Sequence, residues 1–188
     1  MKLAPEALTP LLLPPEPARP QSNVPQAAVL LLISAAPRPH TILTLRSADL
    51  PTHPGQISLP GGLVAAHDAS VEATALREAQ EETGLDPGAV QVLGRLPQVL
   101  VASGVEITPV VGWTATWPQF QADPREVAEI IPCPLSILLQ PQQYRRESLL
   151  RDGQRREFWV IDIQQHRVWG ATAAILYSLA SLLQSTSD

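Results

Sequence analysis

Four charged residues, Arg77, Glu78, Glu81 and Glu82, have a spacing that places three carboxylates on one helical face. Side chains three or four positions apart on a helix are neighbours, with Cβ atoms roughly 5–6 Å apart. Three such carboxylates repel one another, so the cluster needs a compensating partner. A hard divalent cation such as Mg²⁺ takes oxygen ligands of this kind. The spacing alone also fits an ordinary solvated helix face, which is common for Glu and Arg.

The helix that must carry these carboxylates has recognisable ends in the sequence. Its N-cap is expected at Asp68 or Ser70, and apolar residues follow at helical spacing from Val71 to Ala79. Gly84 suits the left-handed position that closes a helix, and an Asp-Pro pair shortly after it prevents continuation. The pattern therefore predicts a helix from about residue 70 to residue 84.

Strands are predicted before, between and after two helices. The apolar and β-branched runs that predict them are 29–34, 41–46, 90–96, 105–113, 129–133 and 158–163. The first two runs are expected to form a hairpin, and a helical turn is expected at 135–139. A second helix with an apolar stripe is predicted over 170–184. This order favours an α/β fold, in which a mixed β-sheet is sandwiched between α-helices.

Three segments lack a regular pattern. Residues 1–26 are rich in proline and are expected to form an extended or irregular arm, in which Leu11–Leu13 could dock onto the body. Residues 47–59 are expected to form a loop. Residues 140–156 carry five arginines in a polar context and are expected to form an irregular excursion.

Composition narrows the class of protein. A length of 188 residues fits one domain with a good-sized core, and a net charge of −5 argues against a nucleic-acid-binding surface. The single cysteine, Cys133, excludes an internal disulfide and is expected to be a buried small hydrophobe in a reducing compartment. No apolar run approaches the ~20 residues of a membrane span, so a cytoplasmic protein is expected.

Residues 61–85 resemble the Nudix box, the signature of the Nudix hydrolase superfamily. The core of that motif, Arg-Glu-hydrophobic-x-Glu-Glu-x-Gly-hydrophobic, appears here at residues 77–85. The upstream part departs from the commonest form, because Asp68 replaces Glu six positions after Gly62 and eight residues, not seven, separate it from Arg77. The resemblance implies a single Nudix hydrolase domain over residues 1–188, with the arm at 1–26 and the box at 62–85.

Residues 42–62 resemble the extra motif that coenzyme A pyrophosphatases carry just before their Nudix box. That motif contains Leu-Leu-Thr-x-Arg-Ser and a later Gly-x-x-x-Phe-Pro-Gly-Gly, and the one-residue-longer box also fits this subgroup. Two positions differ, because Pro51 stands in place of an Arg and Leu59 in place of a Phe. The resemblance implies metal-dependent hydrolysis of the diphosphate of coenzyme A or its derivatives, giving 4′-phosphopantetheine and adenosine 3′,5′-bisphosphate.

The resemblance, read with the chemistry of the side chains, also suggests site residues. Arg77, Glu78, Glu81 and Glu82 form the expected catalytic group. Glu78 and Glu82 are the strongest candidates for ligands of Mg²⁺ or Mn²⁺, while Glu81 is expected to hold a second ion or an ordered water. One of these glutamates is a candidate general base. Arg77 is expected to orient a glutamate rather than to touch the substrate.

Further candidates lie outside the helix. Glu126, ahead of Glu129, is the candidate for an additional metal ligand from a later loop. Substrate contacts are expected from the upstream motif and the glycine turn, at Arg46, His53, Gly55, Gln56, Gly61 and Gly62. The Gly62 carbonyl is a further possible metal ligand. The arginines of 145–156 either meet the 3′-phosphate of coenzyme A or merely solvate a loop.

Several alternatives stay open. The substrate of a Nudix enzyme could instead be another nucleoside diphosphate derivative, such as ADP-ribose or a dinucleotide. A Nudix-fold sensor that binds such a ligand without hydrolysing it is a rival of another class. Asp68 and Glu72 are expected to be cap and surface residues, and His53 could be an ordinary loop histidine. The expected partner is a small-molecule substrate, and the protein is expected to be a monomer or a homodimer.

Overall fold

The computed structural model describes residues 3–16, 23–35, 38–151 and 153–185. Its main feature is an eight-stranded sheet with the order β3-β2-β1-β7-β5, in which β4 also pairs with β1, β6 with β7 and β8 with β2. The β1–β7 pairing is parallel and the others are antiparallel. The strands are β1 (Gln26–Ser34), β2 (His40–Arg46), β3 (Ile57–Ser58), β4 (Gly61–Leu63), β5 (Gln91–Arg95), β6 (Val99–Leu100), β7 (Glu106–Thr114) and β8 (Val127–Pro134).

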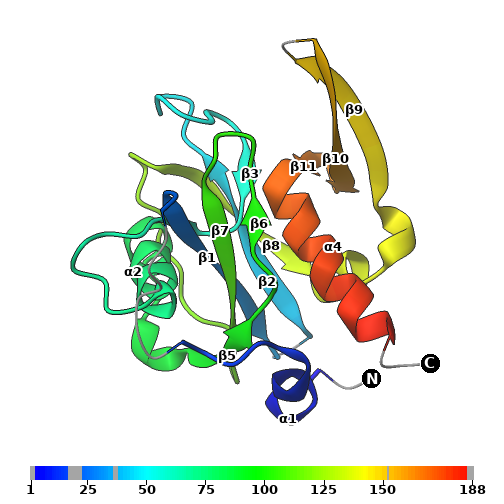
Figure 1. Ribbon diagram of the computed structural model, residues 1–188. Coiled ribbons are helices and arrows are strands. Elements are labelled where there is room, and N and C mark those ends of the chain that lie inside the picture. The colour runs from blue at the N-terminus through cyan, green and yellow to red at the C-terminus, as the bar shows by residue number, and fades with distance from the viewer. Residues whose placement is uncertain (1–2, 17–22, 36–37, 152, 186–188) are drawn as a thin grey trace.

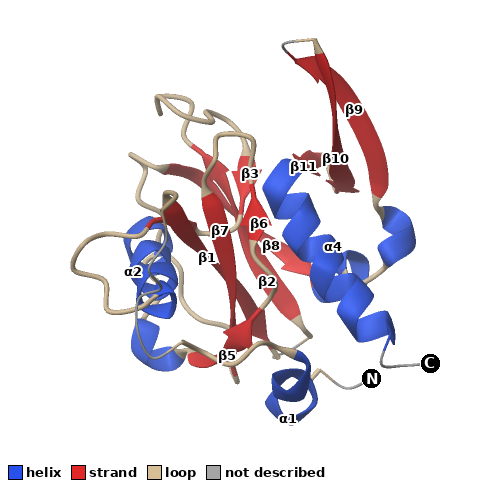
Figure 2. Cartoon of the chain, viewed as in Figure 1, coloured by secondary structure: helices blue, strands red, loops and turns tan. Residues whose placement is uncertain are grey.

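Helices cover both faces of this sheet. The ribbon in Figure 1 shows α2 (Val71–Thr83) on one side of the strands and α4 (Gly170–Ser185) on the other, and Figure 2 shows the same layers by type of structure. The predicted α/β fold with a mixed sheet between helices is therefore confirmed. None of the described helices is long and apolar enough to span a membrane. The shorter helices are α1 (Pro5–Leu8), α3 (Leu135–Leu138) and the 3-10 turns η1 (Thr9–Leu11), η2 (Pro87–Ala89) and η3 (Pro141–Gln143).

Strand β1 shows why helices must cover both faces of the sheet. Leu30 and Leu32 belong to a buried cluster with residues of α2, whereas Leu31 and Ile33 belong to a larger cluster with residues of α4. Because side chains alternate between the two faces of a strand, a continuous apolar run must be covered on both sides. The larger cluster also contains Cys133, which is fully buried as expected.

The helix that carries the carboxylates begins and ends as the sequence indicates. The Ser70 hydroxyl accepts a hydrogen bond from the Ala73 N–H at 3.2 Å, which makes Ser70 the N-cap. Gly84 follows the last turn with φ 67° and donates its N–H to the Gln80 carbonyl. On the side facing the sheet, Val71 and other apolar residues at helical spacing are fully buried. Glu78 and Glu82 follow Val71 at the same helical spacing, so the packing of this face also turns their carboxylates toward β4.

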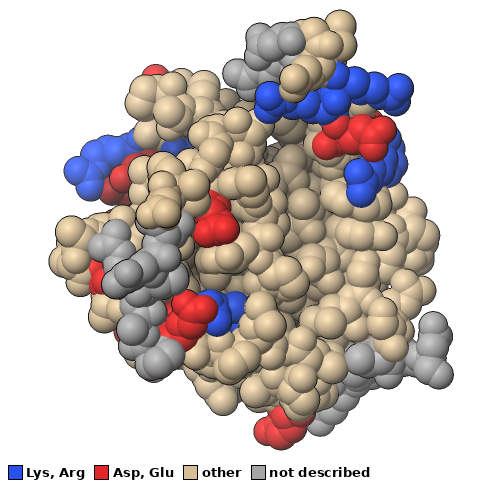
Figure 3. Space-filling view, in the orientation of Figure 1, with Lys and Arg blue, Asp and Glu red and all other residues tan. Residues whose placement is uncertain are grey.

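The expectation of an irregular excursion at 140–156 is wrong. Arg145–Arg151 forms strand β9, which pairs with β10 (Gln154–Ile163), and β10 pairs in turn with β11 (His166–Trp169). This small sheet projects away from the main sheet (Figure 1), and charged side chains gather on it in Figure 3. The sequence signal for this hairpin was the Asp152-Gly153 dipeptide, because Asp-Gly favours a tight turn between two antiparallel strands.

The proline-rich N-terminal arm is more ordered than predicted where it is described. Pro5–Leu8 forms a helical turn with Leu8 buried, so the expectation of an extended or irregular arm is wrong here. The docking of Leu11–Leu13 is confirmed, because Leu11 and Leu12 pack on the core and Leu13 exchanges two backbone hydrogen bonds with Arg95. Positions 1–2 and 17–22 of the arm lie outside the described residues.

Candidate active site

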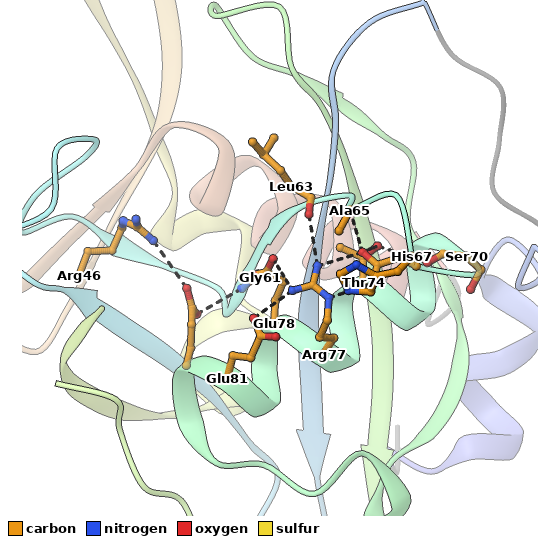
Figure 4. Close-up of polar contacts among 12 residues, drawn as sticks. Arg46, Gly61, Leu63, Ala65, His67, Ser70, Thr74, Arg77, Glu78 and Glu81 are labelled. Atoms are coloured by element: carbon orange, nitrogen blue, oxygen red, sulfur yellow. Dashed lines mark hydrogen bonds and ion pairs between the residues drawn. The ribbon is translucent and has the colours of Figure 1, made fainter. Parts of the chain in front are cut away.

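Arg77 lies at the centre of a network of carboxylates on α2. Its Nη1 donates to Glu78 Oε1 and to Glu81 Oε2, each at 2.9 Å (Figure 4). Its Nε and Nη2 donate to the two oxygens of Asp68, also at 2.9 Å each. A guanidinium that makes two parallel bonds to one carboxylate has a fixed orientation. Asp68 therefore fixes Arg77, whose remaining nitrogen, Nη1, holds Glu78 and Glu81.

The role of Asp68 was missed by sequence reasoning, which placed it as a cap or surface residue. Its carboxylate is buried and also accepts hydrogen bonds from the Ala65 N–H at 2.8 Å and the Thr74 hydroxyl at 2.9 Å. The hydrogen bonds from Arg77, opposed by burial, hold the pKa of Asp68 well below its usual range. Asp68 is thus a permanent anion that anchors Arg77. The only sequence signal for this pair was that Asp68 and Arg77 lie nine positions apart, on either side of the first turns of α2.

Glu82 occupies the most enclosed position among the candidate ligands. Its side chain is 2% exposed, Oε2 accepts the Gly61 N–H at 3.3 Å, and Oε1 lies 3.6 Å from Arg46 Nη1. The dashed line from Arg46 in Figure 4 marks this ion pair, which joins the end of β2 to α2. By contrast, the Glu81 side chain is 55% exposed. The exposure of these carboxylates therefore ranges from buried at Glu82 to exposed at Glu81.

The carboxylates carry more negative charge than the neighbouring cations offset. Burial raises the pKa of Glu82 to about 8, and the charges of Glu78 and Glu126 add to this increase while Gly61 and Arg46 oppose it. Burial also raises the pKa of Glu78, with Glu81 and Glu126 adding to the increase and Arg77 opposing it. Buried like charges raise proton affinity because the ionised forms repel one another. The same surplus of negative charge attracts a metal cation.

The glycine turn brings the backbone of β4 against the Glu78 carboxylate. A Cβ at position 62 would lie 2.4 Å from the Glu78 carboxyl carbon, so a side chain there would displace this carboxylate. Gly61 has φ 156°, and a Cβ there would lie 2.3 Å from the Ala28 carbonyl oxygen of β1. Gly61 is therefore required by the close approach of β1, and Gly62 leaves room for the Glu78 carboxylate. The β4 backbone lies directly against the carboxylates of α2.

The candidate substrate residues of the upstream motif are joined to Arg46. The Arg46 N–H donates to the Gln56 carbonyl at 2.9 Å, and the Arg46 carbonyl accepts the Gly55 N–H at 3.2 Å. His53 Nδ1 lies 3.0 Å from Gln56 Oε1, and His53 itself has φ 55°. His53 and Gly55 are exposed. The structure therefore brings this loop to the site through Arg46, and within the described part of the chain no hydrogen bond or ion pair joins His53 to the carboxylates.

Glu126 lies in the loop before β8, and its charge adds to the raised pKa of both Glu78 and Glu82. The loop before β8 is attached to the last turn of α2, because the Asp123 N–H donates to the Glu82 carbonyl at 3.0 Å. The Glu126 side chain itself is exposed and available to a ligand. Glu129, the second candidate, lies on β8 opposite Leu45, and no hydrogen bond or ion pair among the described residues joins it to α2.

The donors at this site fit a divalent cation. Among the described residues no three His, Cys, Asp or Glu side chains already surround a common point, since Arg77 and Arg46 engage several carboxylate oxygens. The chemistry is nevertheless that of a hard-metal site: oxygen donors only, with net negative charge and a buried Glu82 whose pKa is raised to about 8. Glu78 and Glu82, with the Gly62 carbonyl and Glu126, are the groups that would hold the ion.

A separate cavity lies elsewhere and lacks these groups. It has a volume of about 800 Å³, between the turn after β1, α3 and the end of α4, with Leu135, Leu139 and Leu183 in its lining. No Asp or Glu lines it. We therefore place the candidate active site by its charges and not by the volume of this cavity.

Comparison with known proteins decides the family. The sequence pattern of the NUDIX domain matches residues 24–152, which is more than half of the chain. The chain belongs to the Nudix family. A Nudix hydrolase named NudL from Photorhabdus laumondii, itself described as uncharacterized, is 42% identical over 174 residues, which are 93% of each chain. NudL of Pectobacterium atrosepticum is 45% identical over 170 residues, or 90% of this chain and 88% of that one.

Solved structures share the Nudix fold. The Nudix hydrolase RenU of Mycobacterium smegmatis superposes with a TM-score of 0.51 at 24% identity, over 66% of this chain and 79% of its own. An Ap4A hydrolase of Caenorhabditis elegans superposes with a TM-score of 0.54 at 15% identity, over 86% and 95%. The family membership supports a pyrophosphohydrolase that acts on a nucleoside diphosphate derivative.

Proposed function

We propose that this Nudix hydrolase cleaves the diphosphate of coenzyme A or one of its derivatives in the presence of Mg²⁺ or Mn²⁺. The products are 4′-phosphopantetheine, or its acyl form, and adenosine 3′,5′-bisphosphate. The observation that carries the proposal is the ion pair between Arg46 and Glu82. It attaches the motif at 42–62, which resembles that of coenzyme A pyrophosphatases, directly to the carboxylate helix.

Each residue has a role that its position supports. Glu78 and Glu82 hold the ion, which when bound neutralises diphosphate charge and makes water acidic enough to lose a proton near pH 7. Glu81, the most exposed of the four glutamates of α2, holds a second ion or an ordered water and is a candidate base. Arg77 orients Glu78 and Glu81 and is in turn fixed by Asp68.

The substrate contacts are part of the same proposal. Arg46, His53, Gly55 and Gln56 bind phosphate from the side of the β2–β3 loop, while Gly61 and Gly62 let the diphosphate approach the backbone. Glu126 completes the metal site from the loop before β8. Among the arginines of 145–156, Arg146 is already engaged, because it lies over the Trp159 ring at 4.5 Å and 3.5 Å from Glu157. Their contact with a 3′-phosphate remains a prediction.

The organisation of the chain is also proposed. Residues 153–188 follow the segment that matches the family pattern, yet α4 shares the larger buried cluster with strands of the main sheet. This shared core supports a single domain over residues 1–188. A cytoplasmic location and a monomeric or homodimeric state stay predictions.

A second candidate is hydrolysis of another nucleoside diphosphate derivative, such as ADP-ribose or a dinucleotide. Pro51 and Leu59, the two departures from the coenzyme A motif, favour this alternative. Pro51 is exposed in the β2–β3 loop, where an arginine would have supplied an additional cation. A sensor without activity is disfavoured, because Glu78, Glu81 and Glu82 are all present around Arg77.

The test is product analysis by mass spectrometry after reaction in ¹⁸O-labelled water. Coenzyme A, acetyl-coenzyme A, 3′-dephospho-coenzyme A, ADP-ribose and a diadenosine polyphosphate are compared, with Mg²⁺ and with Mn²⁺. We expect coenzyme A or its thioester to give the highest kcat/KM, with ¹⁸O in one phosphate product. Preference for the 3′-dephosphorylated substrate or for ADP-ribose would reject coenzyme A. Binding without any product under either metal would indicate a sensor.

A further inference from the structure

Arg46 is held firmly by its backbone and loosely by its side chain. It is the last residue of β2, at a point where the register with β8 shifts, and both its N–H and its carbonyl are bonded to the β2–β3 loop. Its Nη1 lies 3.6 Å from Glu82, longer than the 2.9 Å contacts that Arg77 makes with its carboxylates. Its buried Nε has no hydrogen-bond partner among the described residues.

A buried N–H without a hydrogen-bond partner costs free energy. An anion that accepted a hydrogen bond from Arg46 Nε would therefore stabilise this guanidinium. The side chain is 20% exposed, which leaves a path to a ligand at the surface of the site. Arg77, by comparison, satisfies Asp68, Glu78 and Glu81 at once and has no donor left for a substrate. Arg46 is therefore the guanidinium of this site that can change its partner.

A cation bound by Glu82 would compete with Arg46 for the same carboxylate. Two positive charges that share one carboxylate in a poorly hydrated site repel each other. The guanidinium then loses its attraction to Glu82 and can turn to another anion. A diphosphate bound to the same metal presents such an anion, with oxygens that match the fork of an arginine.

We propose that Arg46 exchanges its ion pair with Glu82 for one with the substrate diphosphate, so that metal and diphosphate bind cooperatively. This inference rests on the proposed function, since it takes the α2 carboxylates as the metal site. Arg46 has two consequences for affinity. Without diphosphate it weakens metal binding, because it occupies the ligand and repels the ion. With diphosphate it strengthens the binding of both ligands.

The experiment measures the affinity for Mn²⁺ by electron paramagnetic resonance, with and without methylenediphosphonate, which has a P–C–P bridge that cannot be hydrolysed. The ratio of the two dissociation constants is the coupling factor. Arg46→Met removes the charge, and Arg46→Lys keeps a charge without the fork. Arg38→Met is the matched control, because Arg38 is exposed beyond the opposite end of β2 and its loss changes the net charge equally. Thermal unfolding checks that each variant is folded.

We expect Arg46→Met to bind Mn²⁺ alone several-fold more tightly than the wild type and to lose about tenfold of the coupling factor, within the usual range for coupled sites. Arg46→Lys should lie between the two, and Arg38→Met should match the wild type. An unchanged coupling factor in Arg46→Met, or weaker binding of Mn²⁺ alone, overturns the inference. If Arg46→Met does not fold, the same criteria apply to Arg46→Lys, whose coupling factor must fall below that of the wild type.

The outcomes separate this inference from the proposed function. A wild-type protein that binds no Mn²⁺ contradicts the metal site itself, and the exchange with it. A wild-type protein that binds Mn²⁺ and hydrolyses a diphosphate, but whose coupling factor does not depend on Arg46, contradicts the exchange alone.

Discussion

The two ends of α2 each carry a buried carboxylate, in different surroundings. In the first turn, Glu72 accepts the Glu16 N–H at 2.9 Å and lies 3.6 Å from Arg95 Nε. Arg95 in turn donates to the Pro14 carbonyl and forms an ion pair with Glu16, so it is satisfied by the N-terminal arm. The expectation that Glu72 is a surface residue is wrong, because this network buries it.

In the last turn, Glu82 is equally buried but poorly compensated. Its backbone contact is longer, at 3.3 Å, and its arginine keeps an unpartnered Nε. The charges of Glu78 and Glu126 raise its pKa further. Each carboxylate lies 3.6 Å from one arginine, and Glu72 Oε2 is also buried without a hydrogen-bond partner among the described residues. The two ends therefore differ mainly in the neighbouring negative charge, because Glu78 and Glu126 act on Glu82. That surplus of negative charge is what a divalent ion would offset.

The largest expected effect comes from removing the charge of Glu82. Glu82→Gln should lower kcat by more than the roughly 10–100-fold that loss of an outer-shell partner costs a metal site. Steady-state kinetics with saturating Mn²⁺ measures this effect. Glu72→Gln is the matched control at the other end of α2 and should keep kcat within a few-fold. Equal losses in both variants would remove the distinction between the two ends.

At the first turn of α2, loss of a charge is expected to lower the stability of the fold rather than kcat. Arg95→Met should lower the free energy of unfolding by about 3 kcal/mol, because it leaves buried Glu72 without its cation. Urea denaturation measures the change. Arg125→Met is the control, since the Arg125 side chain is 86% exposed and its pair with Asp123 contributes little. If Arg95→Met left stability unchanged, Arg95 would not be what neutralises Glu72.

Substitutions at two glycines are expected to separate the roles of the metal site and of the N-terminal arm. Gly62→Ala places a Cβ 2.4 Å from the Glu78 carboxyl carbon, so we expect about tenfold weaker Mn²⁺ binding or more, with little loss of stability. Gly94→Ala places one 2.5 Å from the Leu13 carbonyl of the arm, at φ 154°, so we expect lower stability with unchanged Mn²⁺ affinity. Calorimetric titration and thermal unfolding of both variants distinguish the two effects. The opposite pattern would contradict the assignment.

A further effect is expected on the pH dependence of stability without metal. The pKa of Glu82 is about 8 when folded, against an ordinary value near 4.5, so the folded state retains a proton that the unfolded chain releases. The contribution of Glu82 to stability therefore falls as pH rises from about 5 to 8, and levels off above that. The difference between the wild type and Glu82→Gln isolates this slope. A difference that does not depend on pH would mean that Glu82 is ionised throughout.

Much of the fold could be predicted from local patterns. The ends of α2 follow from Ser70 and Gly84, whose capping chemistry is local, and β1 and β2 follow from apolar runs. Strand β9 was not predicted, because four of the seven residues of Arg145–Arg151 are charged and they show no alternation of apolar and polar side chains. The helical turn at Pro5–Leu8 was hidden by the surrounding prolines, although proline is well suited to the first position of a helix.

For the site, sequence reasoning proposed the carboxylates but not the network that fixes them. Glu78, Glu81 and Glu82 were proposed because helical spacing is regular. The pairing of Arg77 with Asp68 spans a loop and the start of the helix, and the pairing of Arg95 with Glu16 joins residues 79 positions apart. Such contacts depend on how elements pack together, and periodicity carries no information about them.

The central claim is that the carboxylates of α2 bind a divalent ion beside β4. The most direct test is anomalous diffraction from crystals soaked in Mn²⁺, for the wild type and for Glu82→Gln. We predict a peak between α2 and Gly62, within coordination distance of Glu78 and Glu82, and its loss in the variant. A wild-type map with no peak there, while Arg46 and Arg77 keep their carboxylate partners, would contradict the account.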